Sequence, residues 1–75
     1  MEIYKNFGGN SNARAYEIEN DSIKVQFGDG SVHLYTYQSA GRNNIEHMKT
    51  MAVIGRGLNS FIMRHIRKAY AAKLV

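Results

Sequence analysis

The sequence predicts an α+β domain, in which a three-stranded antiparallel sheet is followed by two helices packed on one of its faces (β-β-β-α-α). Residues 23–27 alternate apolar and polar side chains without a break, which is the period of a strand with one buried face. From Ile45 onward, apolar residues recur three and four positions apart, which is the period of a helix. Because each element has only one apolar side to bury, we expect both helices on the same face of the sheet.

The first half of the chain reads as three strands joined by short turns. Residues 1–12 form an irregular lead-in, and the first strand covers Ala13–Ile18. A polar turn leads to the strand at 23–27, and the glycine-flanked turn at 28–30 closes a hairpin. The third strand covers residues 31–37, which are rich in β-branched and aromatic side chains. The strand at Ala13–Ile18 lies at the edge of this sheet, so it could pair with a second copy and make a dimer.

The second half of the chain reads as two helices. Asn43 caps the first helix, and Glu46 three residues later completes a capping box. Gly55 and Gly57 are stop signals between the helices. The last helix covers residues 58–72 and is capped by Asn59.

Length and composition favour one small globular domain that spans residues 1–75. The 75 residues include no cysteine, so neither a disulfide nor a thiolate metal site can stabilise the fold. No apolar run is long enough to span a membrane, and the N-terminus lacks a signal-peptide core, so we expect a soluble, cytoplasmic protein. The three histidines are too scattered for a metal site, and no nucleophile lies beside a base. We therefore expect no enzyme activity, no metal and no cofactor.

The net charge of +4 is concentrated in the second half of the chain. Residues 1–40 carry three cations and five anions, whereas residues 41–75 carry seven cations and one anion. Arg64, Arg67 and Lys68 share one side of the last helix, with Arg56 and Lys73 nearby. Arginine suits phosphate because its guanidinium offers paired donors. This pattern predicts a site for an anionic partner.

Two simpler interpretations of these cations stay open at this point. Cations near the C-terminus of a helix complement the helix dipole without binding anything. Arg67 could also pair with Glu17 or Glu19 on the sheet and have a purely structural role.

His33, Tyr35 and Tyr37 occupy one face of the third strand, while Val32, Leu34 and Thr36 occupy the other. If the tyrosine face is open, it can stack nucleobases; if it lies under the helices, the tyrosines belong to the core. A three-residue loop in the hairpin would place His33 and Tyr35 on the buried face with the strand at 23–27. A two- or four-residue loop would bury the aliphatic face instead.

The order of several short motifs resembles the KTSC family, a domain found at the C-terminus of some lysyl-tRNA synthetases and as small stand-alone bacterial and phage proteins. The motifs are Ser11-Asn12-Ala13 before a strand, the tyrosines of 29–37 after a Gly-containing hairpin, and Gly57-Leu58-Asn59 followed by Arg67 and Tyr70. The sequence departs from the family in two places. Residues 33–37 read HLYTY, so the first tyrosine of the family motif could align with either His33 or Tyr35. The Val-Pro that usually follows the motif is replaced by Ser39-Ala40-Gly41. The resemblance implies the fold above and a role with RNA.

These observations together predict a small non-enzymatic nucleic-acid-binding module for RNA or single strands. Its predicted contacts are Arg64, Arg67, Lys68 and Arg56, with Tyr35 and Tyr37 added if their face is open. The alternative is a protein-interaction module, such as a small phage or mobile-element protein that docks an acidic surface of a host complex. In that case Met63, beside Arg64 and Arg67, would be part of the contact.

Overall fold

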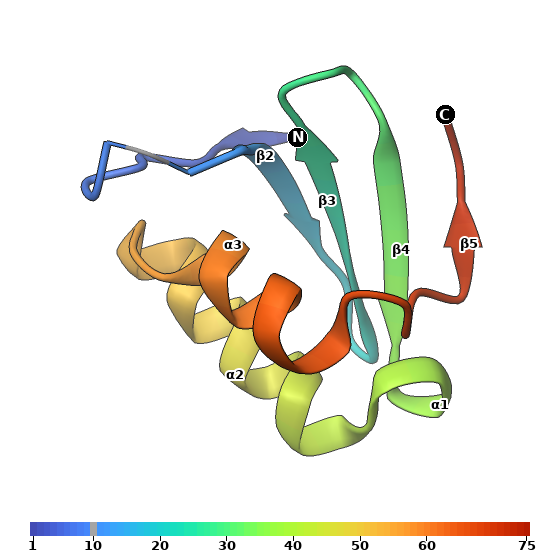
Figure 1. Ribbon diagram of the computed structural model, residues 1–75. Coiled ribbons are helices and arrows are strands. Elements are labelled where there is room, and N and C mark those ends of the chain that lie inside the picture. The colour runs from blue at the N-terminus through green and yellow to red at the C-terminus, as the bar shows by residue number, and fades with distance from the viewer. Residues whose placement is uncertain (10) are drawn as a thin grey trace.

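The computed structural model describes residues 1–9 and 11–75 and shows an α+β fold built on one antiparallel sheet (Figure 1). The elements follow in the order β1 (Glu2–Ile3), β2 (Ala13–Ile18), β3 (Ser22–Phe27), β4 (Val32–Thr36), α1 (Tyr37–Ala40), α2 (Arg42–Ile54), α3 (Leu58–Phe61), the π-helix η1 (Ile62–Ile66) and β5 (Ala72–Lys73). The five strands neighbour one another in sequence order. In Figure 1, α2 and α3 lie together on one side of the sheet, and β5 forms its far edge.

The sheet is wider than predicted because both of its edges are extended by short strands. β1 pairs with β2, so the lead-in is not wholly irregular and Ala13–Ile18 is not an edge strand. The prediction for residue 10 lies outside the described residues. At the other edge, β5 pairs with β4, with Lys73 opposite His33. Two-residue strands carry no periodic signal, and their pairing satisfies backbone groups that would otherwise line an open edge.

The β3–β4 hairpin has a three-residue loop, which is the alternative that was predicted to bury His33 and Tyr35. Phe27 N–H donates to the Ser31 carbonyl at 2.8 Å, which leaves residues 28–30 as the loop. Tyr35 therefore lies opposite Ile23, and His33 lies opposite Val25. The face that carries Tyr35 is thus the face that the helices cover.

β4 ends earlier than predicted because Thr36 starts a helical turn. The Thr36 hydroxyl accepts from Ser39 N–H and the Ser39 hydroxyl accepts from Thr36 N–H, both at 3.0 Å, which is a capping box for α1. Tyr37 is thus the first residue of α1, and the predicted strand face that joined it to Tyr35 does not exist. α2 also starts before the predicted cap at Asn43, after Gly41 and without a side-chain cap.

The last helix is shorter than the predicted 58–72. It begins after Gly57, so Asn59 is inside the helix rather than its cap, and it ends as the π-helix η1 at Ile66. The chain then turns, and Ala71 N–H donates to the Leu34 carbonyl at 2.7 Å. Pairing with the free edge of β4 therefore replaces the last predicted helical turns.

The core lies between the inner face of the sheet and the helices. Its fully buried large side chains are Tyr35, Ile23, Ile45, Met48, Leu58, Ile62 and Val25. The predicted apolar faces of α2 and of the last helix supply most of the helical part of this core. Tyr70, which lies within the predicted helix 58–72, follows the end of η1 in the structure and is 38% exposed.

Candidate nucleic-acid interface

The predicted cations of the last helix are all exposed and make no ion pair with the described residues. Arg64 lies on η1, Arg67 and Lys68 follow it directly, and Lys73 lies on β5. The ion pairs found in the described chain are elsewhere, between Lys24 and Glu17 and between Lys49 and Glu46. The alternative in which Arg67 pairs with Glu17 or Glu19 on the sheet is therefore wrong.

Arg56 lies apart from these cations, between α2 and α3. Its guanidinium carbon is 5.9 Å from the centre of the Phe7 ring, a cation–π distance. The connection between α2 and α3 and the strand β5 are on opposite sides of the molecule in Figure 1. The predicted phosphate contacts therefore form a broad surface rather than one cluster.

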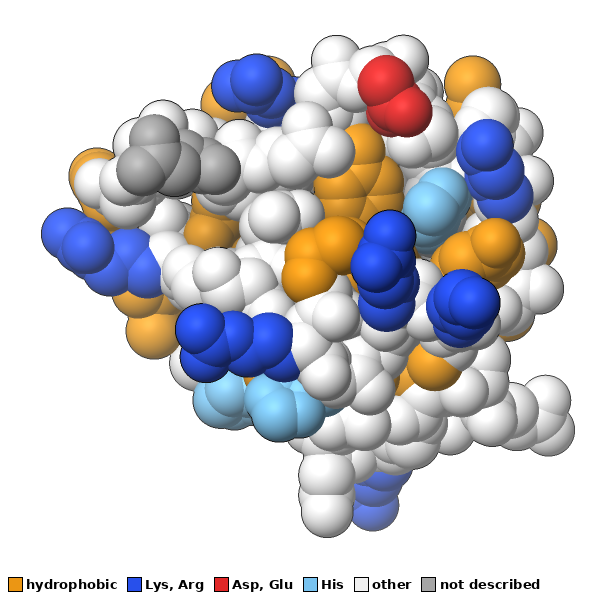
Figure 2. Space-filling view, in the orientation of Figure 1, with side chains coloured by type: hydrophobic (Ala, Val, Ile, Leu, Met, Phe, Trp, Pro, Cys, Tyr) orange, Lys and Arg blue, Asp and Glu red, His pale blue; other side chains and the backbone are white. Residues whose placement is uncertain are grey.

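Figure 2 shows the face that carries α3 and β5. Lys and Arg side chains are spread over it, acidic side chains are confined to its upper margin, and hydrophobic and histidine side chains lie between the cations. We call the exposed cations Arg64, Arg67, Lys68 and Lys73 the basic surface. Their spread suits an extended anionic chain better than one small anion.

The two tyrosines predicted to stack bases do not form an open row. Tyr35 has no exposed surface, so the condition for base stacking by this residue is not met. Tyr37 lies on α1, where its hydroxyl donates to the Glu46 carboxylate at 2.6 Å. Lys49 and Arg42 also lie over the Tyr37 ring, at 5.6 and 5.9 Å from its centre. Tyr37 is therefore engaged in a local network and is not part of the basic surface.

A different aromatic pair lies beside the basic surface. The rings of Tyr70 and His33 are 4.6 Å apart between centres and 35° from parallel, and the Tyr70 side chain is 38% exposed. Tyr70 follows Arg67 and Lys68 closely in sequence, and Lys73 is the strand neighbour of His33. The sequence did not predict this pair, because the contact between the two rings depends on the turn after η1. The helical spacing of the sequence did not indicate that turn.

The environment of His33 disfavours its protonated form. Partial burial, and next the positive charge of Lys73, lower the pKa of His33 below its usual 6.5. Burial, and next the neighbouring Tyr70, raise the pKa of Tyr35 to about 12. The Tyr35 hydroxyl lies 3.5 Å from His33 Nδ1, so it contacts the pair from the core side. The exposed ring of Tyr70 thus packs against His33 and Tyr35, and Lys73 lies opposite His33 in the sheet.

A second exposed surface, with both polar and apolar side chains, lies at the opposite edge of the sheet. A shallow groove of about 460 Å³ is lined by Met1, Glu2, Tyr16, Glu17, Ile18 and Val53. The exposed side chains of Ile3 and Ile54 add further apolar surface on the same elements, β1 and α2. Charge reversal on the basic surface would leave this groove unchanged.

Among residues 1–9 and 11–75, no group of three or more His, Cys, Asp or Glu side chains could hold a metal ion. Within the same residues, no helix is long and apolar enough to cross a membrane. Comparison with protein-family models, curated proteins and solved structures finds no match to this chain.

Proposed function

We propose that this chain is a small non-enzymatic module that binds single-stranded nucleic acid, RNA in particular, through the basic surface and the exposed ring of Tyr70. The observation that carries the proposal is the exposed ring of Tyr70, which packs against His33. Exposed cations precede it in the sequence at Arg67 and Lys68, and Lys73 lies opposite His33 in the sheet. Phosphates would be held by the cations, and a base would stack on Tyr70.

Two features favour a single strand over a duplex. A base can stack on Tyr70 only when one of its faces is not covered by a neighbouring base, as in single-stranded segments. The described cations also follow η1, the turn after it and β5, so they trace a path rather than one side of a long recognition helix. The resemblance of the Gly57-Leu58-Asn59, Arg67 and Tyr70 pattern to the KTSC family, with its lysyl-tRNA synthetase context, adds support for RNA.

Fluorescent single-stranded RNA and DNA, titrated into the purified protein, test the proposal. We expect the triple variant Arg64→Glu, Arg67→Glu, Lys68→Glu to lose binding. The matched control reverses three exposed cations on other elements, Lys5→Glu, Arg14→Glu and Arg42→Glu, and so changes the net charge by the same amount.

The control separates a local site from a general effect of charge. If both triple variants lose binding equally, the basic surface is not the site. If neither strand binds the unchanged protein at about 50 mM salt, the proposal fails. Circular dichroism of each variant checks that the fold is retained. This control is needed because Arg64 also lies in the last turn of η1 and complements its dipole.

A protein-interaction module with an acidic partner is the second candidate, and the exposure of Met63 favours it. The Met63 side chain is 43% exposed and lies beside Arg64, and methionine and arginine are enriched at protein interfaces. An acidic protein surface would meet the same cations, with Met63 buried in the contact. Retention of a protein from lysate at high salt, lost in a Met63→Asp variant, would support this candidate, because apolar burial is not screened by salt.

A further inference from the structure

The ring-to-ring contacts of the described residues form two groups that share no ring. The first group is the one around Tyr70 at the sheet edge. The second group is centred on Phe61, the last residue of α3, and contains His47 of α2 and His65 of η1. The proposed function uses the first group and leaves the second without a role.

The ring of Phe61 contacts the rings of both histidines of the second group. The ring centres of Phe61 and His47 are 4.8 Å apart and those of Phe61 and His65 are 5.0 Å apart, within the range of aromatic pairs in contact. Phe61 is partly buried and packs against the core, whereas both histidines are exposed. We call His47, Phe61 and His65 the histidine platform, because exposed rings rest on a ring that the core holds.

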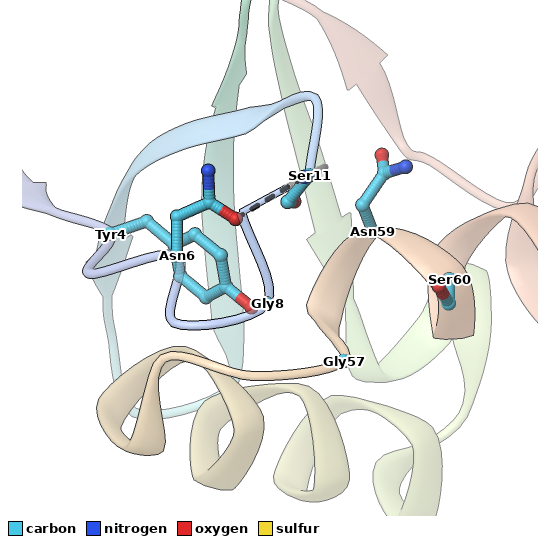
Figure 3. Close-up of a pocket in the computed structure, with 7 residues that line it drawn as sticks. All are labelled: Tyr4, Asn6, Gly8, Ser11, Gly57, Asn59 and Ser60. Carbon is cyan, nitrogen blue, oxygen red and sulfur yellow. Dashed lines mark hydrogen bonds between the residues drawn. The ribbon is translucent and has the colours of Figure 1, made fainter.

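The position of Phe61 is fixed because the start of α3 is tied to the lead-in loop. The Tyr4 hydroxyl accepts from Leu58 N–H at 3.3 Å, and both residues are buried. Figure 3 shows this junction, in which the loop and the start of α3 face each other across a small pocket. Phe61 N–H in turn donates to the Gly57 carbonyl at 3.0 Å. The histidine platform is therefore carried by an anchored helical turn.

The charges around the histidine platform suit a phosphate backbone. Arg64 precedes His65 directly and Lys68 follows three residues later, and both cations are exposed. On α2, the residues three and four positions from His47 are all uncharged, and the acidic residue of this helix, Glu46, is already paired with a lysine. In Figure 2, histidine side chains lie next to a Lys or Arg side chain on the face that carries α3. An anionic strand therefore meets positive charge beside these rings.

The chain between Phe61 and Tyr70 connects the two aromatic groups. It contains the π-helix η1, a rare conformation that occurs frequently at functional sites. The exposed cations Arg64, Arg67 and Lys68 lie between the two rings in the sequence. In Figure 1, this part of the chain leads from α3 toward β5 at the sheet edge. A strand that stacks one base on each aromatic group would therefore pass its phosphates over these cations.

We propose that the histidine platform is a second base-stacking position for the single strand that binds at Tyr70. Unstacked bases of single strands stack on histidine and phenylalanine rings as they do on tyrosine. Because stacking uses a face that every base has, the platform adds affinity without a base preference. The inference rests on the proposed function and extends its site from one aromatic position to two.

NMR of the unchanged protein tests the second position, because the three histidines report on both aromatic groups. His33 reports on Tyr70, whereas His47 and His65 report on the histidine platform. At constant pH, a single-stranded RNA of about ten nucleotides should move the ring signals of all three with one common affinity. An abasic strand of the same length carries the phosphates without bases, and it should leave the signals of His47 and His65 nearly unmoved.

Variants of the two exposed histidines test their contribution to affinity. The double variant His47→Ser, His65→Ser should bind the RNA about tenfold more weakly, the usual effect of losing one stacked base. His47→Phe with His65→Phe keeps both rings and should bind nearly as well as the unchanged protein. The matched control, Asn43→Ser with Met63→Ser, changes exposed residues of the same two elements and should retain the affinity.

The outcomes separate this inference from the proposed function. Movement of the His33 signals alone, or full affinity in the serine variant, overturns the histidine platform and leaves the nucleic-acid module standing. Equal movement of the His47 and His65 signals with the abasic strand also overturns it, as does a phenylalanine variant as weak as the serine variant. If the serine variant does not fold, the comparison of RNA with the abasic strand decides the question. Binding of no strand overturns both proposals.

Discussion

Tyr35 on β4 lies directly opposite Ile23 on β3, and neither side chain has exposed surface. This pairing follows from the three-residue hairpin loop, and it assigns the tyrosine face of β4 to the core. The exposed aromatic ring beside the basic surface is consequently Tyr70, which packs against His33 at the sheet edge. The roles of core and surface aromatic residues therefore depend on the length of one turn.

Replacement of Tyr35 should affect stability and leave nucleic-acid affinity unchanged. Tyr35→Ala should lower the free energy of unfolding by about 3–5 kcal/mol, because it leaves a cavity in a thin core. Tyr35→Phe should have a much smaller effect, since the hydroxyl makes only a 3.5 Å contact with His33 Nδ1. Denaturant unfolding measures both changes. A folded Tyr35→Phe protein with weakened binding would contradict the buried role.

Replacement of Tyr70 should affect nucleic-acid affinity and leave stability largely unchanged. Tyr70→Ala should weaken single-strand binding by about 1–3 kcal/mol, the usual contribution of one stacked base. Tyr70→Phe should bind nearly as well as the unchanged protein, because the ring is retained. Titration of both variants with the same RNA makes the comparison. Equal affinities for the alanine and phenylalanine variants would exclude stacking on this ring.

The buried side of the last helix is tested by Ile66, which is 3% exposed at the end of η1. Ile66→Ala should lower the free energy of unfolding by about 2–5 kcal/mol. Met63→Ala, on the exposed side of η1, should change it by no more than about 0.5 kcal/mol. Thermal or denaturant unfolding of the pair measures the difference. Similar losses in both variants would show that the helix is rotated relative to this structure.

The lowered pKa of His33 predicts a pH dependence of stability. Because the folded protein binds the proton less well than the unfolded chain, stability is full above about pH 6.5 and falls as the pH drops through the folded-state pKa. Lys73→Met should raise the His33 pKa, since it removes one of the causes of the shift. NMR titration of the imidazole protons measures the value. A His33 pKa at or above 6.5 in the unchanged protein would contradict the described environment.

Local sequence patterns were sufficient to predict the central part of this fold. The unbroken alternation at 23–27 predicted β3, and the helical spacing of Ile45, Met48 and Ala52 predicted the buried side of α2. Gly55 ends α2 in the left-handed conformation, at a φ of 86°, as its glycine predicted. These features depend on neighbours within a few residues, which a sequence displays directly.

Features that depend on distant partners could not be predicted in this way. β1 and β5 exist because each pairs with a longer strand, and the end of the last helix is set by the free edge of β4. The Thr36 and Ser39 capping box did carry a local signal, with the pattern of a helix start, but the strand pattern up to Tyr37 concealed it. The candidate site combines both kinds: its cations could be read from sequence, whereas the Tyr70 and His33 pair required the fold.

The salt dependence of RNA affinity tests the central claim most directly. If the basic surface holds three to four phosphates, log K should fall against log salt with a slope of about −2 to −3 for a single strand. The variant that reverses Arg64, Arg67 and Lys68 should lose most of this slope together with its affinity, while the reversal of Lys5, Arg14 and Arg42 should retain the slope. An unchanged slope in the first variant, or RNA binding that does not respond to salt, would contradict a phosphate-binding role for this surface.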